Sequence, residues 1–145
     1  MKTYSGLINE LPDNGVFVYG ANTQGRHGAG AAKVAYDKFG AVYGKIGWQG
    51  QSYGIVTKNL RKKTHPSISI QEIVDQIDSL YNVATMHPKL DFYVAYSGTG
   101  TNLNYYSPNQ MARMFACRYI PENMVFEESF AELIRNRRWE EEYED

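Results

Sequence analysis

Short continuous apolar runs alternate along this chain with segments of helical periodicity, and this alternation restricts the fold more than any other feature. The run Val16-Phe17-Val18-Tyr19 is bracketed by Asn14-Gly15 and Gly20, which is typical of a strand buried on both faces. Similar runs predict strands at Tyr53 to Thr57, Phe92 to Tyr96 and Met124 to Phe126. Strands that alternate with helices predict an α/β domain with a largely parallel or mixed sheet.

Capping signals and apolar spacing predict four helices. The first carries apolar residues at Ala31, Ala32, Ala35, Tyr36 and Phe39 and ends at Gly40. The second begins at Ser69, which forms a capping box with Glu72, and its apolar face comprises Ile70, Ile73, Val74, Ile77, Leu80, Tyr81 and Ala84, before His87-Pro88 ends it. A capping box of Ser107 and Gln110, with Pro108 at the first helical position, starts the third, which carries Met111, Met114 and Phe115.

The remaining segments suggest how the chain is organised. The fourth helix, with Phe130, Leu133 and Ile134, is expected to fray into a short acidic tail at about 139–145. Residues 41–54 contain four glycines and predict a mobile loop or an irregular hairpin, which leaves open whether this loop closes over a ligand. There is no repeat and no Pro- or Ser-rich linker, so we expect residues 1–145 to form one domain.

Composition excludes several classes of protein. The net charge of −1 argues against a dedicated nucleic-acid-binding protein, and the basic runs at 61–63 and 135–138 are typical of solvated faces. A single cysteine, Cys117, indicates a reducing compartment, and no apolar stretch approaches the length of a membrane span or a signal peptide. We therefore expect a cytoplasmic protein with no membrane partner. The histidines at 27, 65 and 87 fit no metal-ligand motif, so we expect no metal and no cofactor.

Two glycine-rich loops follow predicted strands, and ligands of such sheets bind outside the carboxyl ends of the strands. The first loop, residues 22–30, runs into a helix, whose N-terminus and exposed backbone N–H groups favour a phosphate. The second, Ser97-Gly98-Thr99-Gly100-Thr101, offers small side chains and hydroxyls. A dinucleotide GxGxxG pattern that starts at Gly28 fails at Lys33, and the loop lacks the Gly-Lys-Ser/Thr of a P-loop. The pair of loops predicts a clamp for a diphosphate.

Three segments resemble the macrodomain fold, in particular its branch that removes or reads ADP-ribose on acidic side chains. They are Arg26-His27-Gly28-Ala29-Gly30-Ala31-Ala32 with Lys38-Phe39-Gly40, then Tyr53-Gly54-Ile55-Val56-Thr57-Lys58, and Ser97-Gly98-Thr99-Gly100-Thr101-Asn102. The sequence is also similar to small uncharacterised bacterial and phage proteins with a Gly-Arg-His-Gly-Ala-Gly core. The resemblance spans roughly residues 15–116 and implies one three-layer domain, a mixed sheet with helices on both faces.

The resemblance also implies roles for individual residues. Asn22 would contact the adenine end, Gly28, Ala29 and Gly30 would line the diphosphate and distal ribose, and Gly98 to Thr101 would close over the diphosphate. Lys58 matches the branch's nucleophilic lysine, but Asn102 stands where the family has an aspartate, and an amide cannot act as a general base near neutral pH.

Other side chains near these loops have a functional and a structural interpretation. His27 could donate to a phosphate or act as an acid or base, or it could cap the helix or pack on a tyrosine. Arg26 suits a phosphate and equally suits a surface carboxylate. Trp48, Tyr105 and Tyr106 could stack on adenine, although packing is the more frequent role of such residues.

Several functions fit these observations. The first is binding of ADP-ribose or a related NAD-derived nucleotide without turnover. The second is a hydrolase, an ADP-ribosyl glycohydrolase using Lys58 or His27, that acts on ADP-ribosylated protein or a small ADP-ribose derivative. A third is an interaction domain that binds no nucleotide. The phage resemblance adds a fourth, sequestration of a nucleotide signal.

Overall fold

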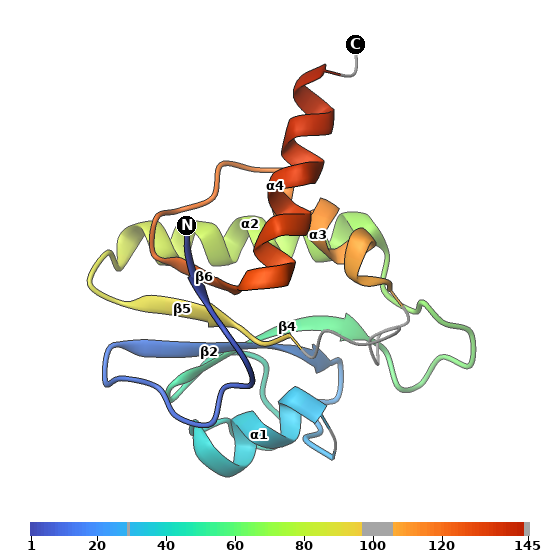
Figure 1. Cartoon of the computed structure of the whole chain (residues 1–145). Coiled ribbons are helices and arrows are strands. Elements are labelled where there is room, and N and C mark those ends of the chain that lie inside the picture. Colours follow the sequence, from blue (N-terminus) through green and yellow to red (C-terminus); the bar gives the residue numbers. More distant parts are fainter. Residues whose placement is uncertain (29, 97–105, 144–145) are drawn as a thin grey trace.

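A mixed six-stranded sheet forms the middle of the computed structural model, which describes residues 1–28, 30–96 and 106–143, with residues 137–143 described by their backbone alone (Figure 1). The strand order is β1-β6-β5-β2-β4-β3, and β3 alone among these strands runs antiparallel to its neighbour. The strands are β1 (Lys2–Tyr4), β2 (Gly15–Asn22), β3 (Gly47–Gln49), β4 (Ser52–Lys58), β5 (Asp91–Val94) and β6 (Met124–Glu127).

Helices cover both faces of the sheet. Helix α1 (Gly30–Lys38) lies on one face, and α2 (Ile70–Met86), α3 (Pro108–Ala116) and α4 (Glu128–Tyr143) lie on the other (Figure 1). This is the three-layer α/β arrangement expected from the sequence. Among the described residues, no helix combines the length and apolar character needed to cross a membrane.

The apolar run in β2 is buried on both faces, as predicted. Phe17 stacks on Phe39, which follows α1, with ring centroids 4.8 Å apart, while Val16 and Val18 point to the opposite face of the sheet and are at most 3% exposed. Burying each of these side chains stabilises the fold by about 1.5–3 kcal/mol. A strand this apolar requires cover on both sides, and the helical layers supply it.

The capping signals located the helix ends correctly. The Ser69 hydroxyl accepts a hydrogen bond from the backbone N–H of Glu72, and α2 ends at Met86 with His87 as its C-cap. The reciprocal capping box of Ser107 and Gln110 starts α3. Of the face predicted for α2, Ile70, the first residue of the helix, is exposed, whereas the other six residues are buried.

Three boundaries differ from the sequence prediction, and one strand was missed. Strand β2 continues to Asn22 because β4 pairs with it beyond Tyr19. Strand β5 ends at Val94, since Tyr96 turns out of the sheet to stack on Phe130 at 4.7 Å. Residues 47–58 form a hairpin, which was one of the two alternatives for 41–54. Helix α4 continues through residues 139–143, which were expected to lie in an acidic tail. The strand that the sequence did not predict is β1.

A buried amide joins the far end of α2 to the sheet. The side-chain nitrogen of Asn123 donates to the carbonyl oxygens of Ala84, His87 and Leu90 at 2.8–3.0 Å. Of these acceptors, the Ala84 carbonyl belongs to the last helical turn, where it also accepts from the N–H of the C-cap residue His87. Asn123 therefore fixes the connection between α2 and β5.

We expect Asn123→Ala to lower the free energy of unfolding by about 1–3 kcal/mol, because it removes the buried side-chain amide that donates to the carbonyls of Ala84, His87 and Leu90. Urea unfolding followed by circular dichroism measures the change. The exposed Asn82→Ala on α2 is the control and should change stability by less than about 0.5 kcal/mol. Equal effects of the two substitutions would contradict this role.

Candidate functional site

The chain reverses its direction across the sheet between β2 and β5. From β2 it passes through α1 to β3 and β4 on one side, and from β5 it passes through α3 on the opposite face to β6 on the other side. Such a switch point leaves a crevice at the carboxyl ends of the two strands, where ligands of α/β sheets bind. Both glycine-rich loops identified in the sequence leave from these two ends.

The first loop is held in shape by contacts within the protein. The side-chain amide of Asn22 accepts from the backbone N–H of Arg26 at 2.9 Å and donates to its carbonyl at 2.8 Å. Both ends of the amide are thereby used to close the turn. Asn22 is therefore a loop-shaping residue, a role that the sequence alone did not indicate.

A second contact ties this loop to residues 42–46. Gly25 has φ +64°, and a Cβ there would lie 2.5 Å from the backbone carbon of Gly44. The two segments are also joined by a hydrogen bond from the Gly44 N–H to the Gly25 carbonyl at 2.8 Å. The close approach requires glycine at position 25 for both conformation and space.

Gly28 and Gly30 lead into α1 at the rim of the crevice. Gly28 is exposed, and a Cβ there would meet no atom within 4 Å. Helix α1 begins at Gly30, which has φ +60°, and its first turn contains no acidic residue. The first N–H groups of a helix have no intrahelical partner and carry a partial positive charge, so this end suits an anion. Ala29 lies outside the described residues.

His27 lies inside the loop but packs inward among tyrosines. It is 7% exposed, and its ring stacks on that of Tyr36 at 5.7 Å and lies near the rings of Tyr19 and Tyr43. The Tyr19 hydroxyl lies 3.2 Å from Nε2 of His27 and accepts from Gln49 at 3.2 Å. The packing interpretation of His27 is thus the one that the structure supports.

The two ring nitrogens of His27 have different surroundings. Gln49 donates to the Tyr19 oxygen, and the Tyr19 hydroxyl and Nε2 of His27 share a hydrogen bond whose direction depends on the tautomer of the ring. Nδ1 is buried and has no hydrogen-bond partner among the described residues. Burial lowers the pKa of His27 and raises that of Tyr19, so both groups are held neutral.

Lys58 ends β4 beside the first loop. It pairs in register with Asn22, and its carbonyl accepts from the Thr23 N–H at 3.0 Å. Its side chain is partly exposed and makes an interaction within the protein. Asn102, with which the resemblance would pair it, lies outside the described residues, as do Ser97, Gly98, Thr99, Gly100 and Thr101.

The aromatic residues considered for base stacking have structural roles where the structure describes them. Trp48 packs edge-on against His87 and Phe92 on the face that carries α2. The Tyr106 hydroxyl donates to the Ile68 carbonyl at 2.5 Å and is buried. Tyr105 lies outside the described residues.

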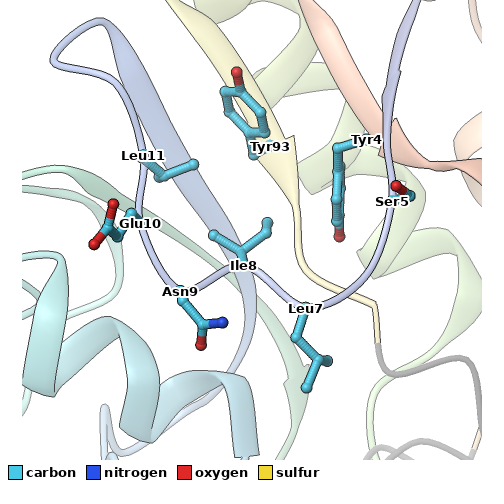
Figure 2. A pocket seen from close by; sticks show the side chains of 8 residues that line it. All are labelled: Tyr4, Ser5, Leu7, Ile8, Asn9, Glu10, Leu11 and Tyr93. Carbon is cyan, nitrogen blue, oxygen red and sulfur yellow. The ribbon is translucent and has the colours of Figure 1, made fainter.

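Sequence reasoning missed a pocket of about 320 Å³ beside the end of β5. Figure 2 shows residues 5–11 curving past β5, with Tyr4, Ile8 and Tyr93 around the space. The Tyr4 hydroxyl donates to the Val94 carbonyl at 2.7 Å, which fixes that wall at the root of the second glycine loop. Burial, with a smaller contribution from Glu127, raises the pKa of Tyr4 and keeps it neutral. The lining residues are Tyr4, Ser5, Leu7, Ile8, Asn9, Glu10, Leu11 and Tyr93.

No group of three or more histidine, cysteine, aspartate or glutamate side chains within the described ranges is arranged to hold a metal ion. His27 contacts tyrosines, His65 contacts Ser67 at 3.0 Å, and His87 contacts Trp48.

In comparisons with known proteins, the chain matches no family model and no curated protein sequence.

We expect Gly25→Ala to lower the free energy of unfolding by about 1–3 kcal/mol, because it adds a Cβ at positive φ against the backbone of Gly44. Gly28→Ala is the matched control, since it adds the same atom in open space, and we expect little change. Urea unfolding measures both variants. A Gly28→Ala variant as unstable as Gly25→Ala would show that the contact with Gly44 is not the cause.

The lowered pKa of His27 predicts a pH dependence of stability. As pH falls below about 6.5, the unfolded chain gains a proton on His27 that the folded protein does not, so folding stability declines until pH reaches the folded pKa. We expect His27→Gln to remove part of this decline between about pH 7.5 and 5.5. Urea midpoints across that range measure it.

His65→Gln, on a different loop, controls for the removal of a histidine as such. If the wild type and His27→Gln lose stability in parallel as the pH falls, His27 does not titrate as its burial requires.

Proposed function

We propose that this protein binds ADP-ribose or a related NAD-derived nucleotide at the switch point between β2 and β5. The observations that carry the proposal are two surfaces of complementary chemistry that adjoin these strands. On one side is the exposed Gly28 backbone at the N-terminus of α1, and on the other is the pocket beside β5. The first suits a diphosphate and the second a purine base.

The glycine loop supplies donors for the diphosphate. Gly28 has no side chain to hold a phosphate away, and the first turn of α1 adds N–H groups and partial positive charge without an opposing carboxylate. The contacts of Gly25 with Gly44 and of Asn22 with Arg26 hold the loop in one shape before a ligand arrives. A preformed loop loses less conformational entropy on binding.

The pocket beside β5 suits the base. Tyr93 and Ile8 offer aromatic and apolar contact to a base. In this assignment the adenine contacts come from residues 5–11 and Tyr93 rather than from Asn22, whose amide already closes the loop.

Binding without turnover is the function we favour over hydrolysis. The protein would hold the nucleotide through backbone N–H groups and stacking, neither of which activates water or attacks the ribose. Neutral His27, buried against Tyr19 and Tyr36, is a poor proton carrier in this arrangement.

Calorimetric titration with ADP-ribose, with ADP and NAD as comparators, tests the proposal. We expect micromolar affinity for ADP-ribose and a loss of about tenfold in Tyr93→Leu, since stacking on one base contributes about 1–3 kcal/mol. Tyr119→Leu is the control, because Tyr119 is 76% exposed and does not line the pocket. No heat with any of the three ligands would refute the proposal. Release of ADP-ribose from an ADP-ribosylated protein would replace it with the hydrolase.

A further inference from the structure

The near-zero net charge of this protein conceals a marked separation of charge. Residues 14–71 contain eight lysines and arginines and a single acidic residue, Asp37, a net charge of +7. The rest of the chain carries −8. The positive part comprises β2, α1, β3, β4 and the loop that follows β4. A protein can therefore present a strongly basic surface although its total charge suggests none.

Contacts between loops gather several of these cations at the carboxyl edge of the sheet. The Gly44 N–H donates to the Gly25 carbonyl at 2.8 Å, which brings the segment bearing Lys45 beside Arg26. The Leu60 N–H donates to the side chain of Gln24 at 3.2 Å, which brings the segment bearing Arg61 to the same loop. We call residues 23–26, 42–46 and 59–63 together the basic rim.

Cations of the basic rim are not neutralised by neighbouring carboxylates. Arg26, Lys45, Arg61 and Lys63 are exposed and form no ion pair among the described residues. Lys62 donates to the Ser67 carbonyl at 3.4 Å, a neutral acceptor that leaves its charge in place. These charges are available to an external anion.

Exposed rings and aliphatic side chains lie among the cations. Tyr43 is 62% exposed within the rim, and Tyr36 on α1 is 51% exposed and lies beside the same loop through His27. Val42, Ile46 and Leu60 are also exposed. Cations interleaved with exposed tyrosines are the pattern with which proteins hold single strands, the cations along the phosphates and the rings against unpaired bases.

We propose that the basic rim binds single-stranded nucleic acid through its phosphates and through bases stacked on Tyr43. An acidic polypeptide would match the charge but offers no planar rings for the exposed tyrosines. A duplex hides its bases within the stack, so the rings favour a single strand. This inference goes beyond nucleotide binding at the switch point, and it does not require that binding.

Fluorescence anisotropy with labelled single strands of about 12 nucleotides, one DNA and one RNA of the same sequence, tests the inference. We expect affinity that falls steeply between roughly 50 and 200 mM salt. The variant Arg26→Gln/Arg61→Gln/Lys63→Gln should weaken binding at least tenfold at the lower salt concentration. Each phosphate contact on a single strand contributes about −0.7 to the slope of log K against log salt, so the slope should become shallower by about 2.

The control removes the same charge from other surfaces. Lys89→Gln/Arg113→Gln/Arg135→Gln alters three exposed cations outside the positive part of the chain, and we expect binding within about twofold of wild type. Tyr43→Ser should weaken binding at both salt concentrations without changing the slope, because stacking is not a counterion effect.

Three outcomes would overturn the inference: no binding by the wild type at the lower salt concentration, equal loss in the two triple variants, or competition by polyglutamate as effective as that by the strand. Because the strands carry no ADP-ribose, the result is independent of the nucleotide titration. A protein that binds the strand and not the nucleotide would retain this inference and lose the proposed function.

Discussion

Strand β2 is the element on which the rest of the structure depends. It lies between β5 and β4, so its backbone donates and accepts on both edges, and its side chains are covered by α1 on one face and by α2 and α3 on the other. A strand with five consecutive buried residues cannot lie at an edge or on an open face without exposing them. The central position of β2 requires helices on both faces. The switch point lies at its carboxyl end because the chain leaves β2 and β5 toward opposite sides of the sheet.

Local patterns were sufficient to predict most of the fold. The helical spacing of apolar residues and the capping residues were sufficient to locate α2 and α3, because Ser69, Ser107 and Gln110 make their hydrogen bonds within one helical turn. They failed for β1, whose three residues carry no local signal and form a strand because they pair with β6, more than 120 residues away in the sequence. They also predicted the end of β5 incorrectly, because Tyr96 packs on Phe130 of α4 and does not continue the strand. Local sequence patterns could not predict features that depend on contacts between residues distant in the sequence.

The candidate site also has parts that the sequence predicts and parts that depend on distant contacts. The glycine loop was predictable because glycines, a strand end and a helix start are adjacent in the sequence. The roles of Asn22 and His27 were not, because the first depends on the closure of the loop onto Arg26 and the second on Tyr19, Tyr36 and Gln49. The pocket beside β5 was missed altogether, since it joins the segment after β1 to Tyr93 and neither part contains a motif.

The separation of charge governs how anions meet this protein. A distant anion senses little attraction, because the net charge is −1 and because charges beyond the Debye length of about 8 Å at physiological salt are largely screened. Attraction becomes strong only within a few ångströms of the rim, where Arg26 and Arg61 are near and the acidic half is screened. The protein therefore discriminates between anions at short range, where the N-terminus of α1, the cations and the exposed rings contact the anion directly. Long-range electrostatic attraction of nucleic acid, which strongly basic proteins exert, is weak here.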